Sequence, residues 1–126
     1  MSKEPGPDIA TTYTVYRPDG TRTIGCVMWP AEPGYGLIKE LIEPLLDEER
    51  REDLEHVTVL HEGKRADMFV AECGRLPMTW RPPLSRNEDA TTIYRNNYLT
   101  QHPGFDPEKI ADIRGVAILF DRQVWF

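Results

Sequence analysis

The stretch TTYTVYRPDGTRTIGCVMW, residues 11–29, decides the fold class of this chain. Its two ends, Thr11–Tyr16 and Thr21–Trp29, are rich in the β-branched and aromatic residues that favour strands. Between them, Pro18 presets the backbone angle of a turn and Gly20 tolerates a positive φ at the end of it. The stretch therefore predicts a β-hairpin with a tight turn.

The second strand of this hairpin is apolar at alternate positions. Alternate side chains of a strand point to the same face of its sheet. We assign to the core the three residues that share this face: Ile24, Cys26 and Met28. The other cysteine, Cys73, also falls in a predicted strand, and the chain has no C-x-x-C pair. Disulfides are rare in the cytosol, so we expect two buried free thiols.

A helix, a second hairpin and a long connection follow. Residues 37–46 are apolar with helical periodicity, but Pro44 lacks an amide proton. We therefore expect either a kink there or a second short helix that starts near Pro44. The runs 56–60 and 66–73 are typical of strands, and residues 61–64 predict the turn that joins them.

A second helix is predicted shortly after residue 84. Ser85 and Glu88 have the spacing of a capping box, and Asn87 is a competing cap. The residues expected to share one face of this helix are Ala90, Ile93, Tyr94 and Asn97.

The end of the chain predicts one more short helix and one or two strands. Asp106, followed by Pro107, has the pattern of a helix start. Residues 115–120 are apolar at almost every position, which indicates a strand covered on both faces. Residues 123–126 are expected to form a paired strand or an extension of the same strand.

These elements predict an α+β fold in the order β-β-α-β-β-α-β. We expect a mostly antiparallel sheet, built from two hairpins plus a C-terminal strand, with two helices packed on one face. Residues 1–10 are polar and have the composition of a flexible leader, which leaves 11–126 as a single domain.

The charge of the chain is uneven. Eight acidic and three basic residues lie between Lys39 and Glu55, which accounts for most of the net charge of −6. Such a run is typical of a solvated helix or loop. We expect no direct binding to a nucleic-acid backbone, because that affinity depends on basic residues. An alternative hypothesis is an acidic mimic of nucleic acid that binds a DNA-binding protein.

Residues with catalytic or metal-binding chemistry are sparse. The three histidines, His56, His61 and His102, lack a shared chelating spacing, and no phosphate loop or G-x-S-x-G motif occurs. We expect no metal, no other cofactor and no enzymatic activity. An enzyme of unrecognised type that uses Cys73 with His56 stays an alternative hypothesis.

The sequence has neither an apolar run of about 18 residues nor a secretory signal. We therefore expect a cytoplasmic protein that does not bind membranes.

One connection has the composition of a contact surface. Residues 74–86 contain three arginines and three prolines and no acid. Proline lowers the entropy that a loop loses on binding, and tryptophan and arginine are frequent interface anchors. The candidate partner-binding residues are Arg75, Met78, Trp80, Arg81 and Arg86. Two alternatives stay open: Trp80 caps the sheet edge while the arginines solvate the loop, or Trp80 stacks on a nucleic-acid base.

Two motifs in the second half resemble a known family. The run PLSRNEDATTIY, residues 83–94, is similar to an N-x-x-A-T-x-x-Y helix start, and IRGVAIL, residues 113–119, is similar to an I-x-G-x-A-x-L strand. Both occur in a domain-of-unknown-function family of small proteins encoded by bacteriophages, plasmids and related bacterial elements. The resemblance covers roughly residues 37–120. It implies a mobile-element origin and no particular activity.

The leading hypothesis is a small cytoplasmic, non-catalytic accessory module that binds a protein partner, whose identity the sequence does not indicate. Exposed aromatic residues and the predicted edge strand at 124–126 would allow a homodimer without requiring one.

Overall fold

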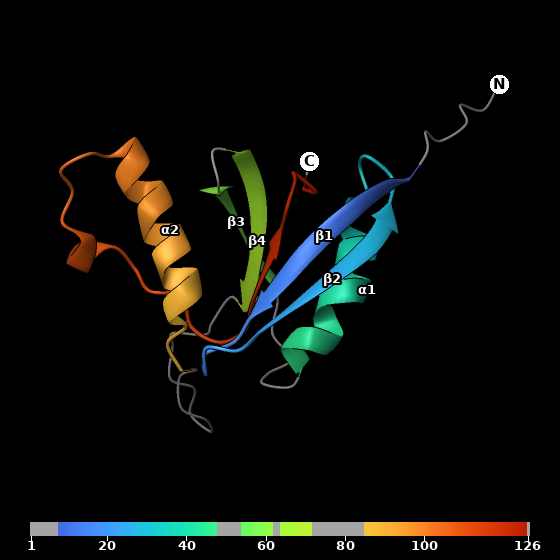
Figure 1. The fold of residues 1–126 in the computed structure, drawn as a ribbon, viewed down its shortest axis with the longest axis horizontal. Coiled ribbons are helices and arrows are strands. Elements are labelled where there is room, and N and C mark those ends of the chain that lie inside the picture. Colours follow the sequence, from blue (N-terminus) through green and yellow to red (C-terminus); the bar gives the residue numbers. More distant parts are fainter. Residues whose placement is uncertain (1–7, 48–53, 62–63, 72–84, 126) are drawn as a thin grey trace.

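The computed structural model describes residues 8–47, 54–61, 64–71 and 85–125. In this part of the chain, five strands form one antiparallel sheet in the order β2-β1-β5-β4-β3, accompanied by two helices (Figure 1). The elements follow one another as β-β-α-β-β-α-β, with a short 3-10 helix before the last strand. The predicted α+β class and element order are confirmed.

The bounds of the elements agree closely with the sequence pattern. They are β1 Ile9–Tyr16, β2 Arg22–Trp29, α1 Gly34–Asp47, β3 Leu54–His61, β4 Lys64–Ala71, α2 Glu88–Gln101, the 3-10 helix Pro107–Lys109 and β5 Ala117–Phe120. α1 continues through Pro44 as one helix, so the predicted second short helix does not form there. The helix start at Asp106 is correct, since its carboxylate accepts from the Glu108 amide, but the helix is a single 3-10 turn.

The turn of the first hairpin is held by local hydrogen bonds. The Gly20 amide donates to the Arg17 carbonyl at 3.0 Å, and Gly20 has φ 88°, which glycine adopts without strain. Asp19 accepts from both the hydroxyl and the amide of Thr21, and these two bonds lower the pKa of Asp19. The hairpin predicted at residues 11–29 is confirmed, with β1 starting at Ile9.

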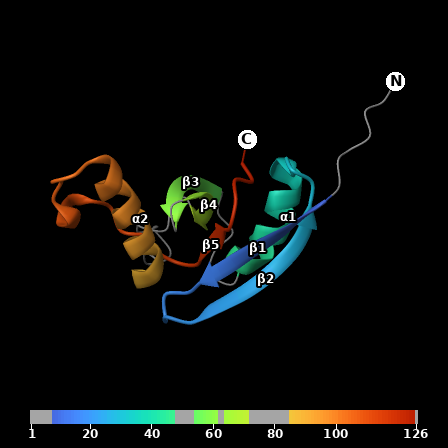
Figure 2. The same ribbon diagram turned by 45° about the horizontal axis from the view of Figure 1, so that its top comes forward.

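β5 lies at the centre of the sheet and is apolar on both faces. Ile118 and Phe120 pack with Ile38 and Ile42 of α1, whereas Ala117 and Leu119 belong to a second cluster that includes Ala90 of α2. The prediction that both helices pack on one face is therefore wrong: α1 and α2 lie on opposite faces (Figure 2). The physical reason is that a strand apolar on both sides needs cover on each.

α2 covers its face of the sheet only in part. It packs on β3 and β4, through residues such as Val59 and Met68, and leaves the same face of the first hairpin without a helix (Figure 2). The assignment of Ile24, Cys26 and Met28 to the core is therefore wrong, because all three point to this uncovered face and are exposed.

Asn87 connects three parts of the fold. Its side chain is fully buried and accepts from the Ala90 amide at 3.1 Å, which makes Asn87, and not Ser85, the N-cap of α2. The other end of the amide donates to the carbonyls of Tyr16, at the end of β1, and Gly115, before β5. These bonds hold the start of α2 against the centre of the sheet.

The segment after β5 is held in place without forming a strand in its described part, residues 121–125. The strand predicted at 123–126 is therefore wrong within those residues. Asp121 exchanges hydrogen bonds with the backbone of Thr12, and Arg122 donates to the carbonyls of Pro30 and Ala31. One backbone bond and several side-chain bonds thus hold this segment in place of strand pairing.

We expect Asn87→Ala to lower the free energy of unfolding by about 3 kcal/mol. The substitution removes the helix cap and leaves two buried carbonyls without a donor. Ser85→Ala is the matched control and should cost less than about 0.5 kcal/mol, because the Ser85 side chain is exposed. Urea unfolding of the two variants measures both values, and equal losses would contradict the role assigned to Asn87.

Candidate functional site

Most of the surface predicted in the proline-rich connection lies outside the described residues. Arg75, Met78, Trp80 and Arg81 belong to this part, so their role stays a prediction. Arg86 is described: its side chain is exposed and its guanidinium pairs with the Glu88 carboxylate at 3.0 Å. Arg86 also forms an isolated backbone bridge with Arg114. Arg86 is thus accessible to a partner and anchored at the start of α2.

β2 forms an exposed apolar edge of the sheet. Ile24 is 69% exposed and Met28 57%, and Cys26 between them is exposed too. From Thr23 to Trp29 the strand has no charge and no proline. Charges and prolines are the features that normally prevent another strand from pairing with an edge. β2 therefore has an unprotected edge along most of its length.

A groove runs along the other face of the same strand. It has a volume of about 420 Å³ and lies between β2 and α1, lined by Val27, Met28, Trp29, Leu37, Glu40 and Leu41. Glu40 is the one charged residue in this lining, and no described residue forms an ion pair with its carboxylate. The groove is thus apolar with a single acid beside it.

The opposite edge of the sheet, β3, is protected. Asn97 of α2 accepts from the Leu60 amide at 2.9 Å and donates to the Thr58 carbonyl at 3.4 Å. These bonds occupy two backbone groups that a neighbouring strand would use. The two edges of the sheet therefore differ: a side-chain amide pairs with the backbone of β3, and β2 lacks such a partner among the described residues.

A buried carboxylate holds the C-terminal segment. Asp67 of β4 is completely buried, and one of its oxygens accepts from the amides of Val124 and Trp125 at 2.7 and 2.8 Å. Its other oxygen lies 2.8 Å from Nε2 of His56. Arg65 adds a longer contact at 3.8 Å. Three contacts of hydrogen-bond length and one longer ion-pair contact thus compensate the burial of Asp67.

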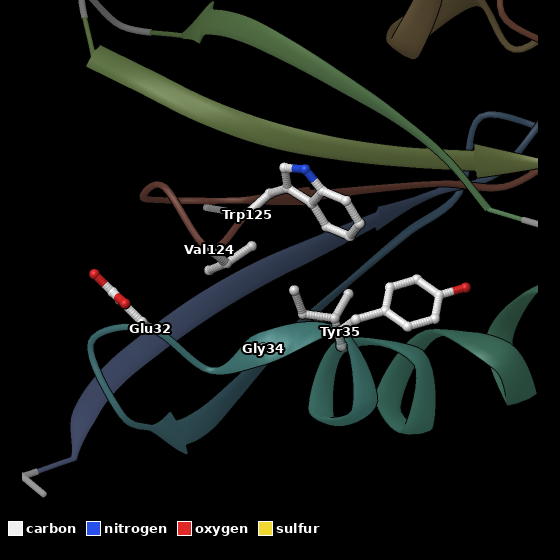
Figure 3. A pocket seen from close by; sticks show the side chains of 6 residues that line it. Glu32, Gly34, Tyr35, Val124 and Trp125 are labelled. Atoms are coloured by element: carbon white, nitrogen blue, oxygen red, sulfur yellow. The ribbon is translucent and has the colours of Figure 1, made fainter.

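This carboxylate positions Trp125 beside a second depression. The indole stacks on the His56 ring, with centroids 5.3 Å apart, and meets the Tyr35 ring edge-on. Figure 3 shows Val124 and Trp125 facing the first turn of α1, which carries Tyr35. The cavity between them has a volume of about 320 Å³ and is also lined by Glu32. Asp67 places two of the residues that line this cavity, because it holds the amides of Val124 and Trp125.

The contacts of His56 bear on the enzyme hypothesis. An Asp–His pair can orient an imidazole for catalysis, but here the same pair has a structural role in anchoring Trp125. Cys73, the suggested nucleophile, lies outside the described residues. The described cysteine, Cys26, lies on β2, at the opposite edge of the sheet from His56 on β3. The Cys73–His56 arrangement stays an untested alternative.

The described residues contain no group of three or more His, Cys, Asp or Glu side chains that could hold a metal ion. None of their helices is long and apolar enough to cross a membrane. Of the acidic stretch 39–55, only a few side chains are described, among them Glu40 and Glu43, so the acidic-mimic hypothesis stays a prediction.

Comparison of the chain with protein-family models, with curated proteins and with solved structures finds no match. The resemblance of residues 37–120 to a family of mobile-element proteins, and the origin that it implies, stay predictions. The structure nevertheless shows that the two motifs contact each other. The backbone N–H of Asn87 donates a hydrogen bond to the Ile113 carbonyl, and the backbone N–H of Gly115 donates to the Ser85 carbonyl.

The sequence analysis missed the residues of the β2–α1 groove. Their signal was the second apolar face of the strand, since Val27 and Trp29 alternate with the three residues that we assigned to the core. Both faces of β2 are apolar, and on the face towards α1 Trp29 is buried and Val27 is partly buried in the core.

We expect Asp67→Ala to release Trp125 and to lower the free energy of unfolding by about 3 kcal/mol, since the buried amide of Val124 and the partly buried amide of Trp125 lose their acceptor. The ¹⁹F resonance of fluorotryptophan at position 125, assigned with Trp125→Phe, should move towards the position of a solvent-exposed indole. Asp89→Ala is the control, because Asp89 forms only a half-exposed pair with Arg22. An unchanged Trp125 resonance in Asp67→Ala would contradict the anchoring role.

Proposed function

We propose that this protein is a non-catalytic accessory module that binds another protein, and that the partner adds an extended segment to the free edge of β2. The observation that carries the proposal is the difference between the two edges of the sheet. The β3 edge is paired with Asn97, whereas β2 presents exposed apolar side chains and a backbone edge with which no described residue pairs.

The physical chemistry of strand addition supports this proposal. An extended peptide that pairs with a sheet edge gains affinity from main-chain hydrogen bonds and specificity from its side chains. Here the side chains on one face would cover Ile24, Cys26 and Met28. Those on the other face would enter the groove beside Leu37. A partner strand would thus bury apolar surface on both faces of β2.

The core on the α1 face of β2 supports a rigid docking surface. Trp29 is buried and stacks on Phe120 with ring centroids 5.4 Å apart, which ties the end of β2 to the centre of the sheet. The neighbouring strand β1 is hydrogen-bonded on both sides, to β2 and to β5. A preformed edge loses little conformational entropy when a partner binds.

Photocrosslinking from Cys26 tests the proposal. The chain has two cysteines, so Cys73→Ser leaves Cys26 as the one attachment point for a benzophenone maleimide in the middle of β2. In lysate from the source cells we expect a discrete adduct with one protein. Adding Ile24→Thr and Met28→Thr, two exposed positions, should reduce the adduct at least tenfold while the melting temperature stays within a few degrees.

The matched control places the same probe on the protected edge. Leu60→Cys, in a chain without Cys26 and Cys73, carries the benzophenone on β3, where Leu60 is also exposed. This protein should give no discrete adduct. Equal adducts from both edges, or an adduct from Cys26 that the two threonine substitutions leave unchanged, would contradict docking on β2.

A further inference from the structure

The partner's chemistry follows from what lies beside the free edge of β2. We propose that the occupant is an extended segment of another protein that carries apolar residues and one lysine or arginine on the side facing α1; this inference rests on the proposed function. The basic side chain would pair with Glu40, and its apolar neighbours on the same face would fill the groove lined by Trp29 and Leu37.

Glu40 is the residue that selects for a cation. It is exposed, it lines an otherwise apolar groove, and no described residue pairs with it. Lys39, next to it in the chain, is turned to the Tyr35 ring, with its ammonium 5.8 Å from the ring centroid. An acid next to apolar surface that a partner would cover loses part of its hydration, so an opposite charge on the partner becomes favourable.

The charge of the whole chain acts in the same direction. With a net charge of −6, the protein attracts a basic segment and repels an acidic one before contact. The edge itself does not oppose this preference, since β2 has no charged residue from Thr23 to Trp29 and its one cation, Arg22, pairs with Asp89 towards α2.

A second copy of this chain does not meet these requirements. If two β2 strands paired edge to edge, the side chains presented to the groove would come from the alternate set Thr23, Gly25, Val27 and Trp29. None of these is basic, and Arg22 belongs to the other face. Self-pairing would therefore leave Glu40 without a cation and would bring two acidic helices together.

Disulfide tethering at Cys26 measures this preference, even for a weak peptide ligand. Two peptides, TVCKTVT and TVCETVT, each form a mixed disulfide with Cys26 in the Cys73→Ser protein. In both peptides the cysteine at position 3 faces Cys26. The side chains at positions 2, 4 and 6 face α1; they are two valines with the lysine or the glutamate between them. The readout is the concentration of 2-mercaptoethanol that reduces half of each mixed disulfide, which rises with the affinity of the attached peptide.

We expect the lysine peptide to resist about fivefold more reductant than the glutamate peptide, the effect of exchanging one exposed ion pair for a like-charge pair. Glu40→Lys should reverse the preference. Glu43→Lys, one helical turn along α1 and outside the groove lining, should preserve most of it.

Three results would overturn the inference. If both peptides resist reduction equally, or if Glu40→Lys leaves the lysine preference unchanged, Glu40 does not select the partner. If sedimentation shows a stable dimer that Ile24→Thr dissociates, the occupant is a second copy. In the first two cases a specific crosslink from Cys26 to another protein would still support the proposed function. A dimer through β2 whose Cys26 probe crosslinks only to a second copy would contradict both, so the failure of the inference and the failure of that function are distinguishable.

Discussion

The buried side chain of Asn87 is the constraint on which the rest of the structure depends. Its side-chain amide caps α2 and donates hydrogen bonds to the carbonyl of Tyr16, the last residue of β1, and to the carbonyl of Gly115, which precedes the central strand β5. Gly115 adopts φ 80°, a backbone conformation that favours glycine, and its amide donates to Ser85. Because these groups are buried, their hydrogen bonds are costly to lose, and α2 is held at one place on the sheet.

The position of α2 in turn determines which surface is left for function. From this position, α2 brings Asn97 to the β3 edge, and it leaves the outer face of the first hairpin uncovered. α1, on the opposite face, packs through Ile38 and Ile42 and brings Glu40 beside β2. Two backbone groups of the β3 edge are thereby paired, whereas none of the described residues pairs with the outer edge of β2. An exposed apolar edge of this kind is prone to self-association, and the proposed partner strand would cover it.

Local patterns predicted most of the fold. Turn residues and strand composition located both hairpins, and Asn87 was recognised as a competing cap. The failures depended on distant contacts. The alternation of residues in β2 could not show which face of this strand is buried, because both faces are apolar. The exposed face is the one on the side of α2, because α2 packs on β3 and β4 and does not extend over β2. Asp67 could not be recognised as an anchor, because its partners Val124 and Trp125 lie 57 and 58 residues away in the chain.

Amide hydrogen exchange tests the central claim, that β2 is an open edge used for strand addition, most directly. In the free protein, the Leu60 amide should exchange slowly because Asn97 accepts its hydrogen bond, whereas the β2 amides that point away from β1 should exchange fast. When the lysine-containing peptide is attached to Cys26, those β2 amides should become slow and Leu60 should not change. Slow exchange along the whole of β2 in the free monomer, or no gain of protection with the peptide attached, would contradict the account.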